Sequence, residues 1–250
     1  VTFEVAGGTV AKRWFPALVS GSANTAGGQV VLGKAPNTLV RLAAQQWSRE
    51  PGPSYPLMGF ATSNMSRTKK DLNRFGGALT SEGEPLEQLA EVLSLPAPSI
   101  VARQSTAGVA RDEDGCYAFG VWHMFSRNAL ARLCLAHDDM AAAQALYEPL
   151  GLWNTAGTAP GSSTETYVRH QAFADLPQPL QFGAASAASL VHPGVTLHFE
   201  VESVQAAEAA AAAAGVAHVP APELGNTSFP SGGILLIDPT SYNVHFSERR

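Results

Sequence analysis

The sequence predicts an α+β fold, and the C-terminal part of the chain carries the clearest signs of it. From Leu197 to Val201 apolar and polar residues alternate with the period of a β-strand. The stretch from Val204 to Ala214 is almost pure alanine, a strong helix former, and Gly215 stands where a helix C-cap belongs. Ile234 to Ile237 then has the composition of a buried strand. These segments predict a strand, a helix and further strands in that order.

The alternation also predicts which side chains share a face of the sheet. Leu197, Phe199 and Val201 fall on one face, which we expect to pack against the helix. The other face, which can meet a ligand, carries Thr196, His198 and Glu200. After a turn at Asp238-Pro239, alternation resumes with Val244 and Phe246.

This unit resembles one βαβββ module of the vicinal oxygen chelate superfamily, which includes glyoxalases, bleomycin-resistance proteins and extradiol dioxygenases. Residues 131–152 look like the opening of another module, with an Asp139-Met140 turn and a helix ending in Tyr147. Residues 58–79 have the same strand, helix and Gly-Gly rhythm, and residues 110–122 look like that module's closing turn and strand. The stretch 1–50 fits only as a module whose first strand and helix are short or rearranged.

The resemblance implies tandem βαβββ modules that form two vicinal-oxygen-chelate-like halves. We expect a divergent N-terminal half, residues 1–125, and a better matched C-terminal half, residues 126–250. We also expect a short amphipathic helix from Leu86 to Leu95 and a loop from Thr155 to Thr166, which either covers a cleft or is a plain surface excursion.

Composition agrees with this layout. A chain of 250 residues with 45% hydrophobic and 15% charged residues can form a packed core in one or two domains. The net charge of −5 argues against a nucleic-acid surface, and the basic group from Arg67 to Arg74 is predicted to be a solvated helix face. No apolar run reaches the roughly 20 residues that span a bilayer. Cys116 and Cys134 fall in predicted strands of different modules, which suggests free thiols and a cytoplasmic location.

The resemblance gives specific positions to check for a metal site. Members that use a divalent metal take ligands from the first strand of a module and from the closing strand. The matching positions here are Arg132, Thr196 and His245. Of these only His245 is a good ligand, because a guanidinium would repel a divalent cation and threonine is a poor ligand. The standard metal site is therefore not expected.

A displaced metal site is the alternative. His198, Glu200 and His245 would form a two-histidine, one-carboxylate set suited to iron, manganese or zinc. Residues two apart on a strand are roughly 7 Å apart, so His198 and Glu200 would have to lean together to share an ion. The competing interpretation is that these residues are the polar lining of a wet cleft, and a metal cofactor is not favoured.

Arg132 has two interpretations, because an arginine in the apolar strand LARLCL needs an anionic partner. It either anchors a carboxylate, phosphate or enolate of a ligand, or pairs with Glu200 as part of the structure. We expect Arg132 and Cys134 to face the concave side of the sheet together with His198 and His245. His137, Asp138 and Asp139 resemble acid-base groups, but at a turn before a helix Asp is more simply a cap.

The predicted function is binding of a small anionic or oxygen-rich molecule in a C-terminal cleft, in the manner of glyoxalase and bleomycin-resistance proteins. The expected lining is Arg132, Cys134, Thr196, His198, Glu200 and His245. Two alternatives stay open: a metal-dependent lyase or dioxygenase with the displaced ligand set, and a non-catalytic scaffold that kept the fold. The expected partner is a small molecule rather than nucleic acid or membrane, and the resemblance also admits a homodimer.

Overall fold

The structure is a computed structural model of the 250-residue chain. It describes residues 1–5, 8–18, 29–32, 38–44, 56–76, 78–80, 107–111, 118–123, 129–153, 180–184, 191, 193–222 and 232–249. The described strands form two sheets, one of seven and one of six strands.

The seven-stranded sheet combines strands from the two ends of the sequence. Its order is β11-β12-β13-β10-β1-β3-β2. The strands are β1 (Thr2–Val5), β2 (Gln29–Leu32), β3 (Thr38–Ala44), β10 (Val195–Val201), β11 (His218–Pro220), β12 (Ile234–Ile237) and β13 (Asn243–Glu248). The two ends of the chain meet where β1 pairs with β10 in antiparallel register, Thr2 opposite Thr196 and Phe3 opposite Val195.

The six-stranded sheet combines strands from the middle of the sequence, in the order β5-β6-β7-β4-β8-β9. The strands are β4 (Leu57–Thr62), β5 (Ala78–Thr80), β6 (Ala107–Arg111), β7 (Ala118–His123), β8 (Ala129–His137) and β9 (Leu180–Ala184). β4 and β8 are antiparallel neighbours, so this sheet also joins strands from the two sides of residue 125.

The helices follow the first strand of each unit. They are α1 (Gly8–Ala17), α2 (Met65–Arg74), α5 (Met140–Tyr147) with the 3-10 turn η2 (Glu148–Leu150), and α6 (Val204–Ala213). The predicted cap at Asp139 is confirmed, because its Oδ1 accepts from the backbone N–H of Ala141 and Ala142. Ser203 caps α6 in the same way. Gly76, Gly151 and Gly215, which follow α2, η2 and α6, all have the positive φ that favours glycine after a helix.

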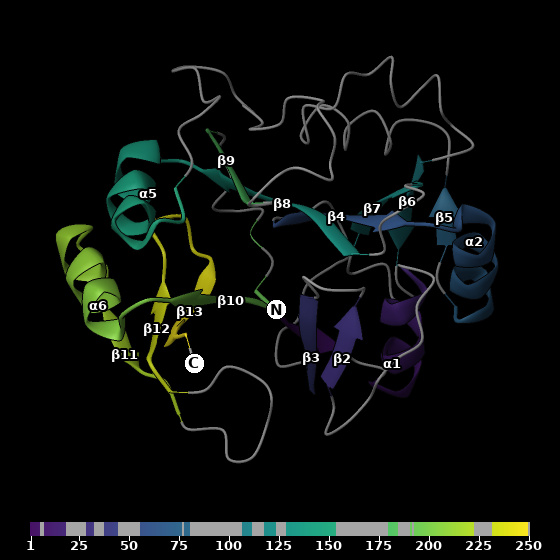
Figure 1. The fold of residues 1–250 in the computed structure, drawn as a ribbon, viewed down its shortest axis with the longest axis horizontal. Helices are drawn as coiled ribbons and strands as arrows, with labels where there is room; N and C mark the ends of the chain where they lie inside the picture. Colours follow the sequence, from purple (N-terminus) through teal and green to yellow (C-terminus); the bar gives the residue numbers. More distant parts are fainter. Residues whose placement is uncertain are drawn as a thin grey trace.

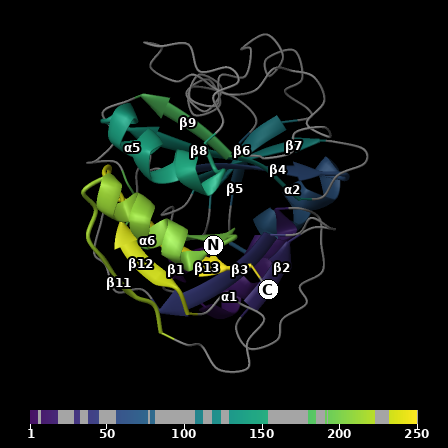
Figure 2. The same cartoon turned by 60° about the vertical axis from the view of Figure 1, so that its left-hand side comes forward.

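Helices and aromatic side chains pack within each half of the sequence, whereas two strand pairs, β1 with β10 and β4 with β8, join the halves. α1 contacts α2 and α5 contacts α6, which places the two helix pairs at opposite ends of the molecule (Figures 1 and 2). One aromatic cluster is built only from residues before 125: Phe3, Trp14, Phe15, Phe60 and Phe119. Another uses only residues after 126: Tyr147, Phe199, Phe246, His137 and Tyr242. This packing supports our proposal of two halves, and the strand pairing shows how they are joined.

The predicted α+β architecture is confirmed. Residues 1–44 form a strand, a short helix and two strands in the usual order, so this unit is short rather than rearranged. The predicted helix at Leu86 to Leu95, the loop at Thr155 to Thr166 and Cys116 lie outside the described residues.

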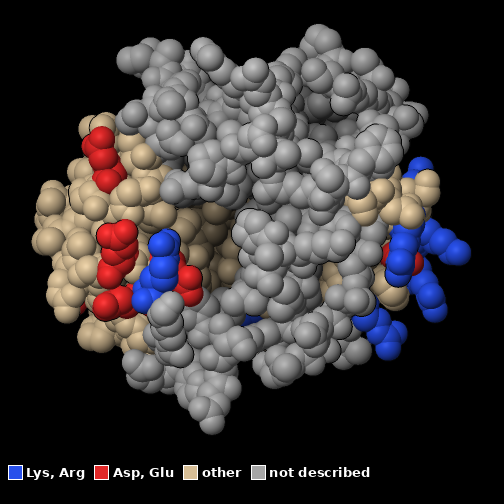
Figure 3. Space-filling view, in the orientation of Figure 1, with Lys and Arg blue, Asp and Glu red and all other residues tan. Residues whose placement is uncertain are grey.

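The charged side chains on the visible face are unevenly placed. Basic side chains gather at α2, where Arg67, Lys69, Lys70 and Arg74 are exposed, whereas acidic side chains gather at the end with α5 and α6 (Figure 3). Among the described helices none is both long and apolar enough to cross a membrane.

Candidate functional site

The two faces of the seven-stranded sheet differ in the way that the alternation predicts. Leu197 and Val201 of β10 are buried on the face covered by α6, and Phe199 packs there against the rings of Tyr147 and Phe246. Thr196 and His198 lie on the opposite face, which we call the groove face. This division arises because α6 follows β10 directly and returns over one side of the sheet.

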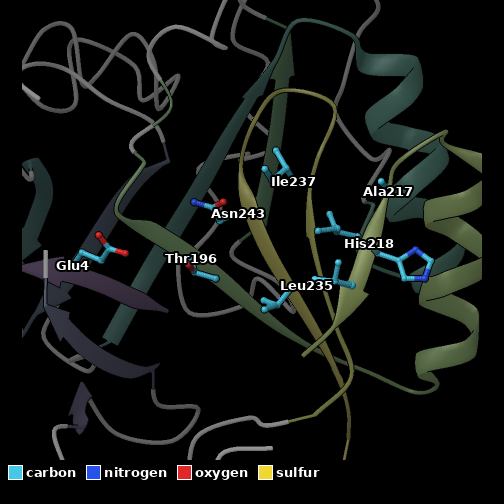
Figure 4. A pocket seen from close by; sticks show the side chains of 9 residues that line it. Glu4, Thr196, Ala217, His218, Leu235, Ile237 and Asn243 are labelled. Atoms are coloured by element: carbon cyan, nitrogen blue, oxygen red, sulfur yellow. The ribbon is translucent and has the colours of Figure 1, made fainter. Parts of the chain in front are cut away.

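A groove of about 450 Å³ lies on the groove face (Figure 4). Its lining residues come from β1, β10, β13, β12, β11 and the residue before β11: Glu4, Thr196, Ala217, His218, Val219, Leu235, Leu236, Ile237 and Asn243. Polar side chains are concentrated toward β1, β10 and β13, and apolar ones toward β12 and β11. The volume lies within the range of small-molecule sites.

The polar end of the groove is organised by the register of its strands. Thr196 of β10 is beside Asn243 of β13, and Thr2, two residues before Glu4 on β1, is opposite Thr196. Asn243 donates its amide N–H from Nδ2 to the carbonyl oxygen of Pro193 at 3.0 Å. A carbonyl only accepts, so this contact identifies the amide nitrogen, and the remaining atom, Oδ1, is an acceptor.

Two histidines lie side by side further along the same face. His198 and His245 are direct neighbours in the parallel pairing of β10 and β13, and their Nδ1 atoms are 2.7 Å apart. The Nε2 atom of His245 is 2.6 Å from the carbonyl oxygen of Gly232, and Nε2 of His198 is 2.8 Å from the hydroxyl of Thr2.

These contacts determine where the protons lie. The Gly232 carbonyl can only accept, so His245 carries its proton on Nε2 and, as a neutral ring, has a bare Nδ1. His198 must then donate from Nδ1 to His245, and its bare Nε2 accepts from the hydroxyl of Thr2. The result is a hydrogen-bond chain from β1 through β10 and β13 to Gly232, in which both rings are neutral.

Burial keeps both rings neutral. It lowers the pKa of His198 to about 2, and the neighbouring His245 adds to the effect. Burial also lowers the pKa of His245, and the hydrogen bond to Gly232 partly opposes that shift. A second proton on His245 would place two N–H groups against each other between the Nδ1 atoms, whereas a second proton on His198 would lie on Nε2 and face the hydroxyl of Thr2.

Comparison with solved structures gives the fold. The chain superposes on glyoxalase I from Zea mays, solved as its V278E mutant, with a TM-score of 0.56 at 15% identity. The match covers 99% of this chain and 90% of the maize chain. The E144Q mutant of the same maize protein gives a TM-score of 0.55 over 99% and 91% of the two chains, also at 15% identity. The chain has a glyoxalase-like fold.

The fold expected from the resemblance is thus confirmed. A glyoxalase/bleomycin resistance protein from Albidiferax ferrireducens T118 aligns with 50% of this chain over 96% of its own length, at a TM-score of 0.32 and 16% identity. No protein-family model matches the sequence, and no curated protein matches it.

The glyoxalase-like fold distributes the predicted site residues over two sheets. Thr196, His198, Glu200 and His245 belong to the seven-stranded sheet. Arg132 and Cys134 belong to β8 of the six-stranded sheet, where Arg132 is opposite Gly59 and Cys134 is opposite Leu57. The side chains of Arg132 and Cys134 lie outside the description, so their participation stays a prediction. Glu200 is exposed, and its register partner is Ser247.

The residues at the positions that the resemblance implies for a metal are a poor ligand set for a divalent ion. They are an arginine, a threonine and His245, and both ring nitrogens of His245 already have hydrogen-bond partners. In the displaced set, the Nδ1 atoms of His198 and His245 form a hydrogen bond with each other, so neither Nδ1 is directed at a metal position. Within the described part of the chain, no group of three or more His, Cys, Asp and Glu side chains could hold a metal ion.

One buried polar cluster of the glyoxalase-like fold was not predicted from the sequence. The carboxylate of Asp238 accepts through Oδ2 from Nε2 of His137 at 2.7 Å and from the hydroxyl of Tyr147 at 2.8 Å. Its Oδ1 accepts from the backbone N–H of Thr240 and Tyr242, each at 2.9 Å. The side chains of His137 and Asp238 are fully buried. Four donors therefore saturate one carboxylate, away from the groove.

The cluster connects the two sheets inside the C-terminal half. His137 ends β8, Tyr147 ends α5, and Asp238 begins the turn between β12 and β13. Burial, and then the charge of Asp238, raises the pKa of Tyr147 well above its usual value. The visible signal was the position of Asp238 at a turn and of His137 at a strand end, but their sequence separation of 101 hides the contact.

Proposed function

We propose that this protein binds a small molecule in the groove of the seven-stranded sheet, without the metal site that the superfamily often uses. The observation that supports this most directly is the groove itself, which lies on the face predicted to meet a ligand and includes Thr196. An exposed face that combines hydrogen-bonding groups with aliphatic side chains is typical of ligand sites. The maize protein that shares the fold is a glyoxalase I, and the groove is where we place the corresponding binding activity.

The expected ligand class is oxygen-rich or anionic, and each property points to a different part of the structure. Hydrogen-bonding groups of an oxygen-rich ligand would meet Thr196 and Asn243 in the groove. An anionic group would need Arg132, which lies in the other sheet.

A ligand panel with two variants separates these possibilities. Thermal-shift measurements with polyols, hydroxy acids and dicarboxylic acids would identify compounds that raise the melting temperature, and calorimetry would give their affinities. If the groove binds the ligand, Asn243→Leu should weaken binding at least tenfold while Arg132→Met has little effect. If Arg132 anchors an anion, the order of the two variants reverses. Lys69→Ala, on the exposed side of α2, is the control. No compound binding above the control level would contradict the proposal.

The metal-dependent lyase or dioxygenase and the non-catalytic scaffold are the alternatives. Metal analysis of protein purified without chelators decides the first: stoichiometric iron, manganese or zinc that is lost in both His198→Ala and His245→Ala would establish the displaced site. A scaffold would bind neither metal nor any compound of the panel. Cytoplasmic location and homodimer formation are also proposals, which cell fractionation and sedimentation would check.

A further inference from the structure

We infer that the groove takes a small uncharged amide with an aliphatic body, bound with its amide group over Thr196 and Asn243 and its body over β12 and β11. This inference rests on the proposed binding function of the groove and narrows the ligand class. It is carried by the hydrogen-bonding groups that one row of the sheet presents next to exposed aliphatic side chains.

One row of neighbouring residues across the strands contains both parts of this site. Thr196 of β10 is beside Asn243 of β13, and Asn243 is opposite Ile237 of β12. All three side chains line the groove (Figure 4). The row therefore changes from hydrogen-bonding to aliphatic side chains within one strand interval, about 4.8 Å.

The hydrogen-bonding side chains of this row both donate and accept. Asn243 uses one N–H for the Pro193 carbonyl and keeps its second N–H and its Oδ1 atom. The hydroxyl of Thr196 has no hydrogen-bond partner among the described residues, and it can donate as well as accept. A ligand head that satisfies both side chains must therefore carry a donor and an acceptor close together.

An amide group meets this requirement, whereas a singly charged head does not. The N–H of an amide can donate to Oδ1 of Asn243, and its carbonyl oxygen can accept from the second N–H of Asn243 or from the hydroxyl of Thr196. An ammonium group has only donors and would cover that second N–H without accepting from it. A carboxylate has only acceptors and would leave Oδ1 of Asn243 without a donor. Covering a polar group without giving it a hydrogen bond weakens binding.

The charged residues beside the row do not select a ligand of one sign. Glu4 of β1 lines the groove, and Arg41 of β3 lies on the same face of the sheet, opposite Thr2. The carboxylate and the guanidinium are on neighbouring strands, so a charged head over Thr196 would be attracted by one and repelled by the other. An uncharged head also loses less hydration than a charged one when the aliphatic body is covered.

The apolar end presents aliphatic side chains that a ligand can cover. Ile237 of β12 is 61% exposed and Val219 of β11 is 59% exposed, and these are the large hydrophobic side chains that the described structure leaves most open. Both line the groove, together with Leu235, which is opposite Val219 and two residues before Ile237. Removing this area from water would favour binding of an aliphatic body.

The spacing of the strands sets the length of the ligand. Asn243 on β13 and Val219 on β11 are separated by two strand intervals, because β12 lies between these strands. Two intervals are roughly 10 Å. An extended chain of about eight carbons is of suitable length, and the groove of about 450 Å³ accommodates it.

Three ligands with the same chain length and different heads test the inference. Octanamide, octylamine and octanoate would be titrated by calorimetry at neutral pH into the full chain, with the backbone amide chemical shifts of the protein recorded by NMR. We expect octanamide to bind at least tenfold more tightly than either charged ligand. Shifts should centre on Thr196 and Asn243 and on Val219 and Ile237.

Two variants test the polar end. Asn243→Leu removes the remaining donor and acceptor of the amide, so it should remove the preference for octanamide over the two charged ligands. Thr196→Val keeps the shape of the side chain and removes only the hydroxyl, so it should weaken octanamide at least threefold even if the Asn243 variant does not fold. A melting temperature within a few degrees of wild type would show that a variant is folded.

Matched variants test the apolar end and the charges. Ile237→Ser combined with Val219→Ser should weaken all three ligands to a similar extent, because the three share one aliphatic chain. Glu4→Gln and Arg41→Gln each remove a charge and keep hydrogen-bonding groups. Both should leave the affinity for octanamide within threefold of wild type.

The outcomes separate this inference from the proposed function. A charged ligand that binds in the groove as tightly as octanamide, or an octanamide preference that survives in folded Asn243→Leu and Thr196→Val, would overturn the inference and leave the proposed function standing. A larger than threefold loss of octanamide affinity in Glu4→Gln or Arg41→Gln would do the same, because charge would then decide binding. If none of the three ligands binds, the inference is overturned. The proposed function then also fails if the panel of oxygen-rich compounds gives no binding.

Discussion

His198 and His245 share one proton between their Nδ1 atoms, and that arrangement makes stability depend on pH. Burial lowers the pKa of both rings in the folded chain, to about 2 for His198. The unfolded chain has ordinary histidines that take up protons below about pH 6.5. Acid therefore favours the unfolded state, and the stabilisation present at pH 7 is lost as the pH falls below that value.

We expect the free energy of unfolding to fall as the pH drops below about 6.5, by up to about 1.4 kcal/mol per pH unit for the proton of His198. His245, whose pKa is also lowered, adds to the fall in the same direction. Urea unfolding at pH 7, 6 and 5 measures it. Replacing both rings, in His198→Gln with His245→Gln, should flatten the pH dependence, whereas His218→Gln, on an exposed strand, should leave it unchanged. A wild-type protein equally stable at pH 7 and pH 5 would show that the pair is not neutral and buried as described.

Asp238 is the residue whose loss should cost the most stability among the buried polar groups described here. Asp238→Ala leaves four buried donors without their acceptor, and we expect unfolding to become easier by about 3 kcal/mol or more. Tyr147→Phe removes one of the four bonds and should cost about 1 kcal/mol. Denaturant unfolding of the two variants checks both values. Similar small losses in both would mean that the cluster contributes little.

Among the elements, the turn into β12 is the most constrained. Gly233 has a φ of 82°, and a Cβ atom built on it would overlap the carbonyl oxygen of Phe246 on β13. Gly215 has a similar φ of 69° but open space around it. Both positions therefore carry the same backbone penalty, and only Gly233 adds a steric clash with a neighbouring strand.

We expect Gly215→Ala to cost about 1 kcal/mol and Gly233→Ala at least about 3 kcal/mol, because backbone atoms of β13 must move. The two melting temperatures give the comparison directly. Equal losses at the two positions would contradict the close approach of Gly233 to β13. Since Gly232 accepts from His245, the Gly233 variant should also disturb the histidine pair, which NMR of the imidazole signals would show.

Elements with strong local signals could be predicted from the sequence. The helix expected at Val204 to Ala214 runs from Val204 to Ala213, since the alanine run, the Ser203 cap and Gly215 act within a few residues. α1 had no comparable signal: it begins at Gly8 and contains Pro16, so its stability comes from the burial of Trp14 and Phe15 in the core. Tertiary packing of that kind leaves little trace in a local pattern.

At the scale of the whole molecule, the sequence could not show which units pair. The four strand-helix units were predicted, but not that β1 pairs with β10 and β4 with β8 between the halves while the helices pack within them. Strand pairing over long separations leaves no period in the sequence. For the same reason the sequence could not show that Arg132 lies in a different sheet from His198 and His245, and the contact between His137 and Asp238 was missed.

The shared sheets predict that neither half is stable alone. Residues 1–125 and 126–250, expressed separately, would expose the edges of β1 and β10 and of β4 and β8, so we expect aggregation or loss of cooperative unfolding. Expressed together, the two fragments should associate into one particle with the circular dichroism of the intact chain, which size-exclusion chromatography would detect. A monomeric fragment 1–125 with a sharp melting transition would contradict this.

Both halves of the sequence contribute to the groove, because Glu4 comes from β1 and the other lining residues come from the C-terminal half. A ligand that contacts Glu4 together with β12 would bridge the short pairing of β1 with β10. Ligand binding and the association of the two halves would then be thermodynamically linked. A ligand at a hundred times its dissociation constant adds about 2.7 kcal/mol to the free energy of unfolding. A split version of this protein would then report its ligand through the reassembly of its own fragments.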